Sequence, residues 1–163
     1  MATLTAANPE LVQSDEHMET ITKLILNGTS WKAGQFLFTD TNDYVKVCES
    51  DADASTGGVK YLALKDQADP GNQTTTAEVG VITQDMIFRG NELNGAVAKT
   101  AVGTAVALDV TSNICTLDLD DTGNDAFEIT DVESDFDPQY DIADTLAKIR
   151  FKVLPAALEA AQA

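Results

Sequence analysis

The segment Lys148-Ile-Arg-Phe-Lys-Val153 shows most clearly how this chain folds. Apolar Ile149, Phe151 and Val153 alternate with cations, which is the period of a β-strand with one face in a core and the other in water. The outward face carries three of the ten Lys and Arg residues of the chain: Lys148, Arg150 and Lys152. This row is a candidate face for an oligomer or a partner. The alternative is a solvated face, or one neutralised by acidic residues of the same chain.

The same period of two recurs in short segments from Trp31 onward, separated by clusters of Gly, Asn, Asp and Thr. This pattern is typical of an all-β domain, so we expect a small barrel or a sandwich. The aromatic residues beside the first of these segments, Trp31, Phe36 and Phe38, are expected in the core. The expected strands are 20–26, 35–39, 44–48, 59–64, 76–82, 86–89, 96–99, 104–110, 113–119, 126–130 and 147–153.

Two segments repeat one design, a Gly, a strand, and an Asp six positions after the Gly. They are Gly34 to Asp40 and Gly103 to Asp109, each followed by a polar turn and a second strand. We expect two hairpins in which Gly adopts an unusual backbone angle and Asp accepts turn amides. The alternative is that Gly and Asp punctuate strands here without a common design.

Three regions follow from the distribution of polar residues. Residues 1–20 form a polar N-terminal arm, in which Asn8 and Pro9 suit the start of a helical turn. Residues 21–154 form the β-domain, and 118–144 within it is an acidic loop without Lys or Arg. Residues 155–163 form an Ala-rich tail that makes a marginal helix at most.

Composition excludes several classes of protein. The 163 residues include 27 Asp and Glu against 10 Lys and Arg, for a net charge of -17. Such a charge repels nucleic acid and anionic lipid, so neither is an expected partner. No apolar run reaches the roughly 18 residues of a membrane span, and no signal peptide precedes the domain, so we expect synthesis in a cytoplasm. Cys48 and Cys115 are then expected as free thiols.

Catalytic patterns are missing from the sequence. The one histidine, His17, lies in the polar arm, where nothing fixes it beside a nucleophile. Two distant cysteines and one histidine do not make a zinc site, and no phosphate-binding glycine motif occurs. We therefore expect no enzymatic activity and no cofactor.

The nearest approach to a metal site is a calcium-loop-like start at Asp118. Oxygen-bearing residues stand at its first, third and fifth positions, and Gly123 stands at the sixth. The twelfth position is Ile129 rather than the bidentate Glu of such loops. A plain acidic turn is the preferred interpretation, and no metal is expected. The weak candidate ligands are Asp118, Asp120 and Asp125.

The Gly-led strands resemble those of the small β-rich head decoration, or cement, proteins of tailed bacteriophages. The resemblance covers about residues 31–154. Its segments are Trp31-Lys-Ala-Gly34, Tyr61-Leu-Ala-Leu64, Gly80-Val-Ile82, Gly95-Ala-Val97, Gly103-Thr-Ala-Val106 and Ile149-Arg-Phe-Lys-Val153. It implies a structural protein on the exterior of the virion capsid, commonly a homotrimer, that binds the major capsid protein and holds capsomers together.

Under that resemblance the arm orders on the capsid. Its apolar residues are the expected capsid contacts: Leu4, Leu11, Val12, Met18 and Ile21. Deletion of residues 2–19 is then expected to abolish binding without harming the fold. The alternative function is a ligand-binding β-module for calcium or a glycan, or the base of a head fibre.

Overall fold

The computed structural model describes residues 4–93, 96–144 and 146–160. In this part of the chain eleven strands form: β1 (Glu10–Gln13), β2 (Thr20–Leu24), β3 (Phe36–Thr39), β4 (Val45–Val47), β5 (Tyr61–Ala63), β6 (Thr76–Val81), β7 (Ile87–Asn91), β8 (Ala105–Thr111), β9 (Ile114–Asp118), β10 (Phe127–Val132) and β11 (Lys148–Val153). Helical segments are short: a π-helix at Asp53–Gly57, 3-10 turns at Lys99–Ala101 and Glu133–Asp135, and α1 (Pro155–Ala160). None of these described helices is long and apolar enough to cross a membrane.

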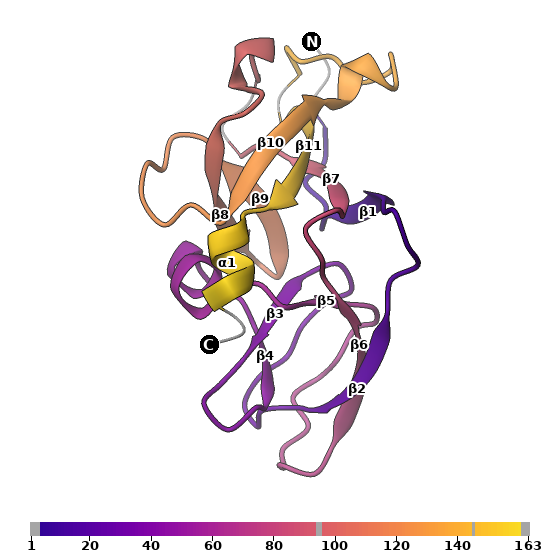
Figure 1. Ribbon diagram of the computed structural model, residues 1–163, viewed down its shortest axis with the longest axis vertical. Coiled ribbons are helices and arrows are strands. Elements are labelled where there is room, and N and C mark those ends of the chain that lie inside the picture. Colours follow the sequence, from indigo (N-terminus) through magenta and orange to yellow (C-terminus); the bar gives the residue numbers. More distant parts are fainter. Residues whose placement is uncertain (1–3, 94–95, 145, 161–163) are drawn as a thin grey trace.

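The strands form two antiparallel sheets, which confirms the expected all-β class (Figure 1). The six-stranded sheet has the order β1-β7-β11-β10-β8-β9, and the five-stranded sheet has the order β2-β6-β5-β3-β4. Each sheet curls until one parallel bridge links its two sides, Glu92 with Leu117 in the first and Ile25 with Val45 in the second. A single bridge is not a ladder, so among the described residues neither sheet closes. The fold is therefore a sandwich rather than a barrel.

Four phenylalanines join the two sheets. Phe36 of β3 projects from the five-stranded sheet and lies 5.4 Å from Phe88, 5.0 Å from Phe127 and 6.3 Å from Phe151, measured between ring centroids. Its three neighbours belong to β7, β10 and β11 of the other sheet, and all four rings are fully buried. The inward face of β11 therefore packs as its alternating sequence predicts.

The second face of the five-stranded sheet curls around a smaller apolar cluster. Leu37 points into this cluster, whereas its neighbours Phe36 and Phe38 point into the main core. Trp31 also packs in the smaller cluster with 3% of its surface exposed, as expected for a core residue. Both faces of β3 are thus covered, which explains why its sequence is apolar without alternation.

The segment around Asn8 is extended, so the expected helical turn there is wrong. The Asn8 amide oxygen accepts the backbone N–H of Cys115 at 2.8 Å, and its nitrogen donates to the Asn113 carbonyl at 3.0 Å. The following residues form β1, which pairs with β7. An extended segment can form hydrogen bonds with the unpaired backbone groups at these sheet edges. The stability gained from those bonds outweighs the local preference of Asn8 and Pro9 for a helix start.

The two Gly-led segments do form hairpins, β3–β4 and β8–β9, in different sheets. Gly34 and Gly103 adopt the same positive φ of 88°, which favours glycine. Asp40 accepts the backbone N–H groups of Asn42 and Tyr44, both at 2.9 Å, as expected. Asp109 instead accepts hydrogen bonds from threonine hydroxyls. The two hairpins therefore share the conformation of the glycine but not the role of the aspartate.

Two further expectations need correction. Residues 96–99 do not form a strand; the 3-10 turn Lys99–Ala101 begins there, with the Ala101 N–H donating to the Ala98 carbonyl. Residues 118–144 are not a single loop, because β10 runs through their middle and pairs with β8 and β11. Burial of apolar side chains of β10, such as Phe127 and Ile129, holds it in the sheet despite the acidic surroundings.

Candidate functional site

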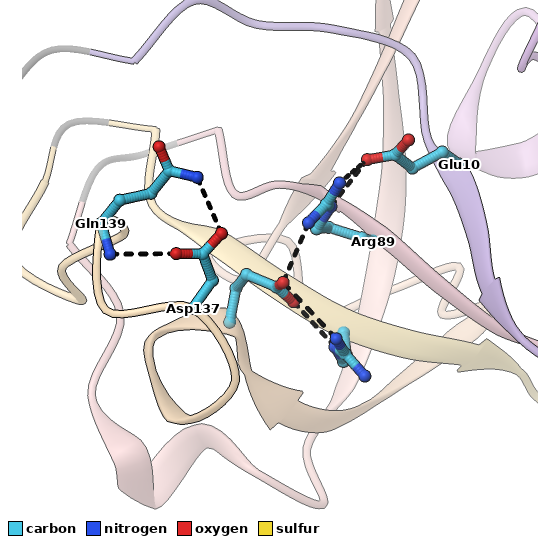
Figure 2. Close-up of polar contacts among 6 residues, drawn as sticks. Glu10, Arg89, Asp137 and Gln139 are labelled. Atoms are coloured by element: carbon cyan, nitrogen blue, oxygen red, sulfur yellow. Dashed lines mark hydrogen bonds and ion pairs between the residues drawn. The ribbon is translucent and has the colours of Figure 1, made fainter.

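The outward face of β11 carries the most concentrated chemistry of the described structure. Its centre is Glu133, whose side chain is 1% exposed. Arg150 donates through Nε to Glu133 Oε2 at 2.7 Å, and Arg89 of β7 donates through Nη1 to Glu133 Oε1 at 3.0 Å. Arg89 also donates through Nε to Glu10 of β1 at 2.7 Å (Figure 2). We call Glu10, Arg89, Glu133 and Arg150 the arginine–glutamate cluster.

Strand register explains why this cluster exists. Arg150 and Arg89 lie directly opposite each other on β11 and β7. Two like charges at such positions repel each other, and the short 3-10 turn after β10 places the Glu133 carboxylate against both guanidinium groups. Glu10 then neutralises the second arginine from the far side, because it lies opposite Arg89 in the β1–β7 pair.

Aromatic side chains cover the same cations. The Arg150 guanidinium lies 3.6 Å from the centroid of the Phe136 ring. Tyr140 faces both Lys148, at 5.4 Å from the ring centroid, and Arg89, at 5.8 Å. These distances are within the range of cation–π attraction. Phe136 is 52% exposed, so one face of its ring remains available to a partner.

The expected cation row is therefore internally compensated in the single chain. Arg150 pairs with Glu133, and Lys152 Nζ lies 4.0 Å from Glu128 Oε1. Lys148 faces Tyr140. All these partners belong to residues 118–144, so the geometry matches neutralisation by the acidic segment. Use of the row as an oligomer or partner face stays a prediction.

Electrostatics around the cluster follow from these contacts. Hydrogen bonds from Gln139 lower the pKa of the Asp137 carboxyl, with a smaller contribution from the charge of Arg89 (Figure 2). Burial by itself lowers the pKa of Arg89, but the ion pairs with Glu10 and Glu133 outweigh burial and raise it. Arg89 therefore stays charged at any physiological pH.

The expected arm contacts are mostly used within the chain. Leu11 and Met18 pack against the main core, and Ile21 packs against the smaller cluster. Leu4 and Val12 are half-buried. Residues Glu10–Gln13 thus form part of the six-stranded sheet, the Asn8 side chain bonds to β9, and removing residues 2–19 would expose core surface. The expectation that this deletion spares the fold is not supported by these contacts.

The weak calcium candidates do not gather into one site. The Asp118 carboxylate accepts the backbone N–H of Asp120 at 2.9 Å and of Asp121 at 3.3 Å, as in a self-capped turn. Across the described residues no group of three His, Cys, Asp or Glu side chains is placed to hold a metal ion. One oxygen of Asp125, Oδ1, is buried and without a hydrogen-bond partner.

The remaining reactive side chains are either exposed or inert. His17 is exposed and lines an acidic hollow of about 310 Å³ with Asp85 and Glu19. Cys48 and Cys115 are buried free thiols, as expected. Burial raises the pKa of Cys48 well above its ordinary value and that of Cys115 to about 11, so neither is a ready nucleophile.

A shallow hollow of about 420 Å³ lies beside Trp31. Its polar side chains already have partners: Asp66 accepts the Ala33 N–H at 2.9 Å, and Asp69 accepts the Gly28 N–H at 2.9 Å. Trp31 is too buried to stack on a sugar ring. This hollow therefore gives no support to glycan binding.

Sequence reasoning found β11 and its cation row but missed Arg89, Glu133, Phe136 and Tyr140. One signal was present: a strand with three outward cations needs counter-charges, and the acidic segment 118–144 is the nearest source in the chain. Which acidic side chain is buried depends on where the chain turns after β10. The alternation of apolar and polar residues in the sequence does not predict the position of that turn.

No known protein family, no characterised protein sequence and no solved structure matches this chain.

Proposed function

We propose that this chain is a structural decoration protein of a tailed-bacteriophage head, without enzymatic activity. In this proposal it lies on the outside of the virion, binds the major capsid protein and assembles as a homotrimer. The observation that carries the proposal is the arrangement of the Gly-led segments. Trp31-Lys-Ala-Gly34 leads into the β3–β4 hairpin, and three further segments contain β5, the end of β6 and the start of β8. Ile149 to Val153 lies in β11.

The physical properties of the molecule fit such a task. Its concentrated polar groups serve its own fold, as the arginine–glutamate cluster shows, and a net charge of -17 keeps free copies apart and away from nucleic acid. A cement protein requires rigidity and contact surface rather than a reactive cavity.

The direct test is co-sedimentation of the purified chain with expanded phage heads stripped of accessory proteins. We expect saturable binding near one trimer per lattice point, and heads that withstand higher temperature. Light scattering on the free chain reports its oligomeric state. A chain that neither sediments with the heads nor protects them would refute the proposal.

The arm can be tested with a deletion that respects the fold. Removing residues 2–6 deletes Leu4 but keeps Asn8 and β1, which hold the six-stranded sheet. We expect weaker head binding at an unchanged melting temperature. Equal binding would remove Leu4 from the set of capsid contacts.

The alternative function is a calcium-binding β-module. The buried, unpartnered oxygen of Asp125 is the observation in its favour. Calorimetric titration with calcium at physiological salt distinguishes the two functions. Heat and a melting shift that Asp125→Asn removes would favour the module, whereas no heat would leave decoration as the function.

A further inference from the structure

The four edge strands of the two sheets differ in how their outer edges are covered. The edge of β4 is closed by the Ile25–Val45 bridge and by the Val47 N–H, which donates to the Thr29 hydroxyl at 3.4 Å. The edge of β9 is covered by the Leu93 N–H, which donates to the Leu117 carbonyl at 2.7 Å, and by Asn8. Both of these edges are protected by the chain itself.

The two remaining edges, β1 and β2, come from the N-terminal part of the chain. β1 is four residues long, and its register with β7 shifts between Leu11 and Gln13. Such an irregularity twists an edge and discourages further pairing. β2 pairs with β6 without a break from Thr20–Gly80 to Leu24–Thr76. Its C-terminal end meets β4 through the Ile25–Val45 bridge, but from Thr20 to Thr22 its outer edge has no strand partner among the described residues. Figure 1 shows β2 on the outside of its sheet.

The hydrogen-bond phase of β2 shows which backbone groups face this open edge. The Val81 N–H donates to the Glu19 carbonyl at 2.8 Å, and the Ile25 N–H donates to the Thr75 carbonyl at 3.0 Å. Bonded and non-bonded pairs alternate along an antiparallel ladder, so the odd-numbered residues of β2 bond to β6. The N–H and C=O groups of the even-numbered residues point outward. These residues are Thr20, Thr22 and Leu24.

The side chains at this edge also suit an added strand. Thr20, Thr22 and Leu24 are all exposed, and Leu24 shows 40% of its surface. Threonine at the first two positions favours extended backbone. A neighbouring strand would cover the outward backbone groups and bury part of Leu24.

The charge around the edge indicates what kind of strand fits. Glu19 and Glu78 are exposed, and neither takes part in an ion pair among the described residues. The cation of the strand, Lys23, is already paired with Asp43. A second copy bound through this same edge would bring its own exposed carboxylates beside Glu19 and Glu78. A strand that carries Lys or Arg would meet the two free carboxylates.

We propose that the open edge of β2 binds an extended, Lys- or Arg-bearing segment of the partner protein, which adds a sixth strand to the five-stranded sheet. This inference rests on the proposed function, in which the partner is the major capsid protein. The contact is made by backbone hydrogen bonds to Thr20 and Thr22 and by attraction to Glu19 and Glu78.

The test compares two substitutions at one position, Thr22→Pro and Thr22→Val, for binding to stripped expanded heads. Proline removes the outward N–H of residue 22 and leaves the bonds to β6, and the preceding residue is already extended. Valine keeps the N–H and the strand preference. We expect Thr22→Pro to weaken binding at least about tenfold and Thr22→Val to bind within about twofold of wild type. Melting temperatures check that both variants fold.

Two further experiments test the edge inference without the proline variant: a second substitution, and hydrogen exchange on the wild-type chain. Glu78→Lys is expected to weaken binding, more strongly at low salt than at high salt. Hydrogen exchange on the wild-type chain is expected to show fast amides at Thr20 and Thr22 in the free protein and slow ones on the heads.

The outcomes separate the two proposals. If wild type fails to bind heads, the proposed function fails and the edge inference fails with it. If wild type binds and Thr22→Pro binds equally well, with no protection at Thr22, the edge inference alone is overturned. It is also overturned if the free chain forms an oligomer that Thr22→Pro dissociates, because the occupant is then a second copy.

Discussion

β11 separates two buried clusters of opposite chemistry. On its inner side Phe151 packs against Phe36 and Phe88, and on its outer side Arg150 pairs with Glu133. Burial of aromatic surface stabilises the first cluster, and this stabilisation depends little on how each ring is oriented. The second cluster must offset the desolvation of a fully buried carboxylate, so much of its attraction is cancelled. We conclude that the phenylalanines supply stability and the ion pairs fix the position of the 133–140 loop.

The largest effect is expected from removal of the central ring of the inner cluster. Phe36→Ala is predicted to lower the free energy of unfolding by about 3–5 kcal/mol, because Phe36 is the ring that joins the two sheets. Phe36→Leu should cost less than about 1.5 kcal/mol as a control that keeps most of the volume. Urea unfolding measures both. A loss below about 1 kcal/mol for Phe36→Ala would show that ring packing does not hold the sheets together.

The outer cluster is expected to respond next, and in a different way. Glu133→Gln leaves two arginines opposite each other without their counter-charge, so we predict a loss of about 2–3 kcal/mol. Replacing Glu133, Arg89 and Arg150 together by Leu or Met should cost far less, because the desolvation penalty disappears with the charges. Urea unfolding of the single and triple variants provides the comparison. A triple variant with a lower free energy of unfolding than Glu133→Gln would contradict the view that these ion pairs mainly fix the position of the 133–140 loop.

Acid should affect the charged exterior and not the apolar cluster. Asp51, Asp66, Asp69, Asp85 and Asp137 each have a pKa below the ordinary aspartate value of 3.8, because they accept hydrogen bonds in the folded chain. The unfolded chain therefore takes up protons first as the pH falls. The stability that these groups contribute is complete above about pH 4 and is lost below it.

Calorimetric melting between about pH 6 and pH 2 checks this expectation. Asp137→Asn should reduce the decline below pH 4, whereas Phe36→Leu should shift the whole curve without changing its shape. A melting temperature independent of pH below 4 would mean that these hydrogen bonds are absent in solution.

The smallest effect is expected at the exposed rim of the outer cluster. Phe136→Ala removes the ring that lies on Arg150, and since the ring is 52% exposed we predict a loss under about 1 kcal/mol. Urea unfolding beside Phe36→Ala gives the contrast between two phenylalanines of one chain. A loss comparable with that of Phe36→Ala would place the 133–140 loop in the folding core.

Most strands could be predicted because each carries its own pattern. β11, β8 and β10 alternate or run apolar between turn residues, and they form within a few residues of the expected bounds. The prediction of a strand at 96–99 is wrong because only Val97 is buried there, so the segment has no apolar face to pack in a sheet. β1 was missed because its four residues form a strand by pairing with β7, and local sequence does not report that partner.

The candidate site was predictable in part for the same reason. The cation row follows from the period of β11, and neutralisation by residues 118–144 was one of the alternatives to a partner face. Arg89 could not be singled out, since its place opposite Arg150 depends on the order of strands in the sheet. The open edge of β2 likewise depends on which neighbours the sheet supplies.

The sequence by itself determined the all-β class, the inward and outward faces of each regular strand, the two positive-φ glycines and the strongly acidic surface. These properties are local, because a period of two and the stereochemistry of single residues act over a few positions. Only the tertiary structure decided that Glu133 is buried between two arginines, that Glu10–Gln13 add a strand to a sheet, and that β2 is left with an uncovered edge from Thr20 to Thr22. Those properties depend on contacts between residues far apart in the chain, and packing against the whole fold selects among the many pairings that local pattern allows.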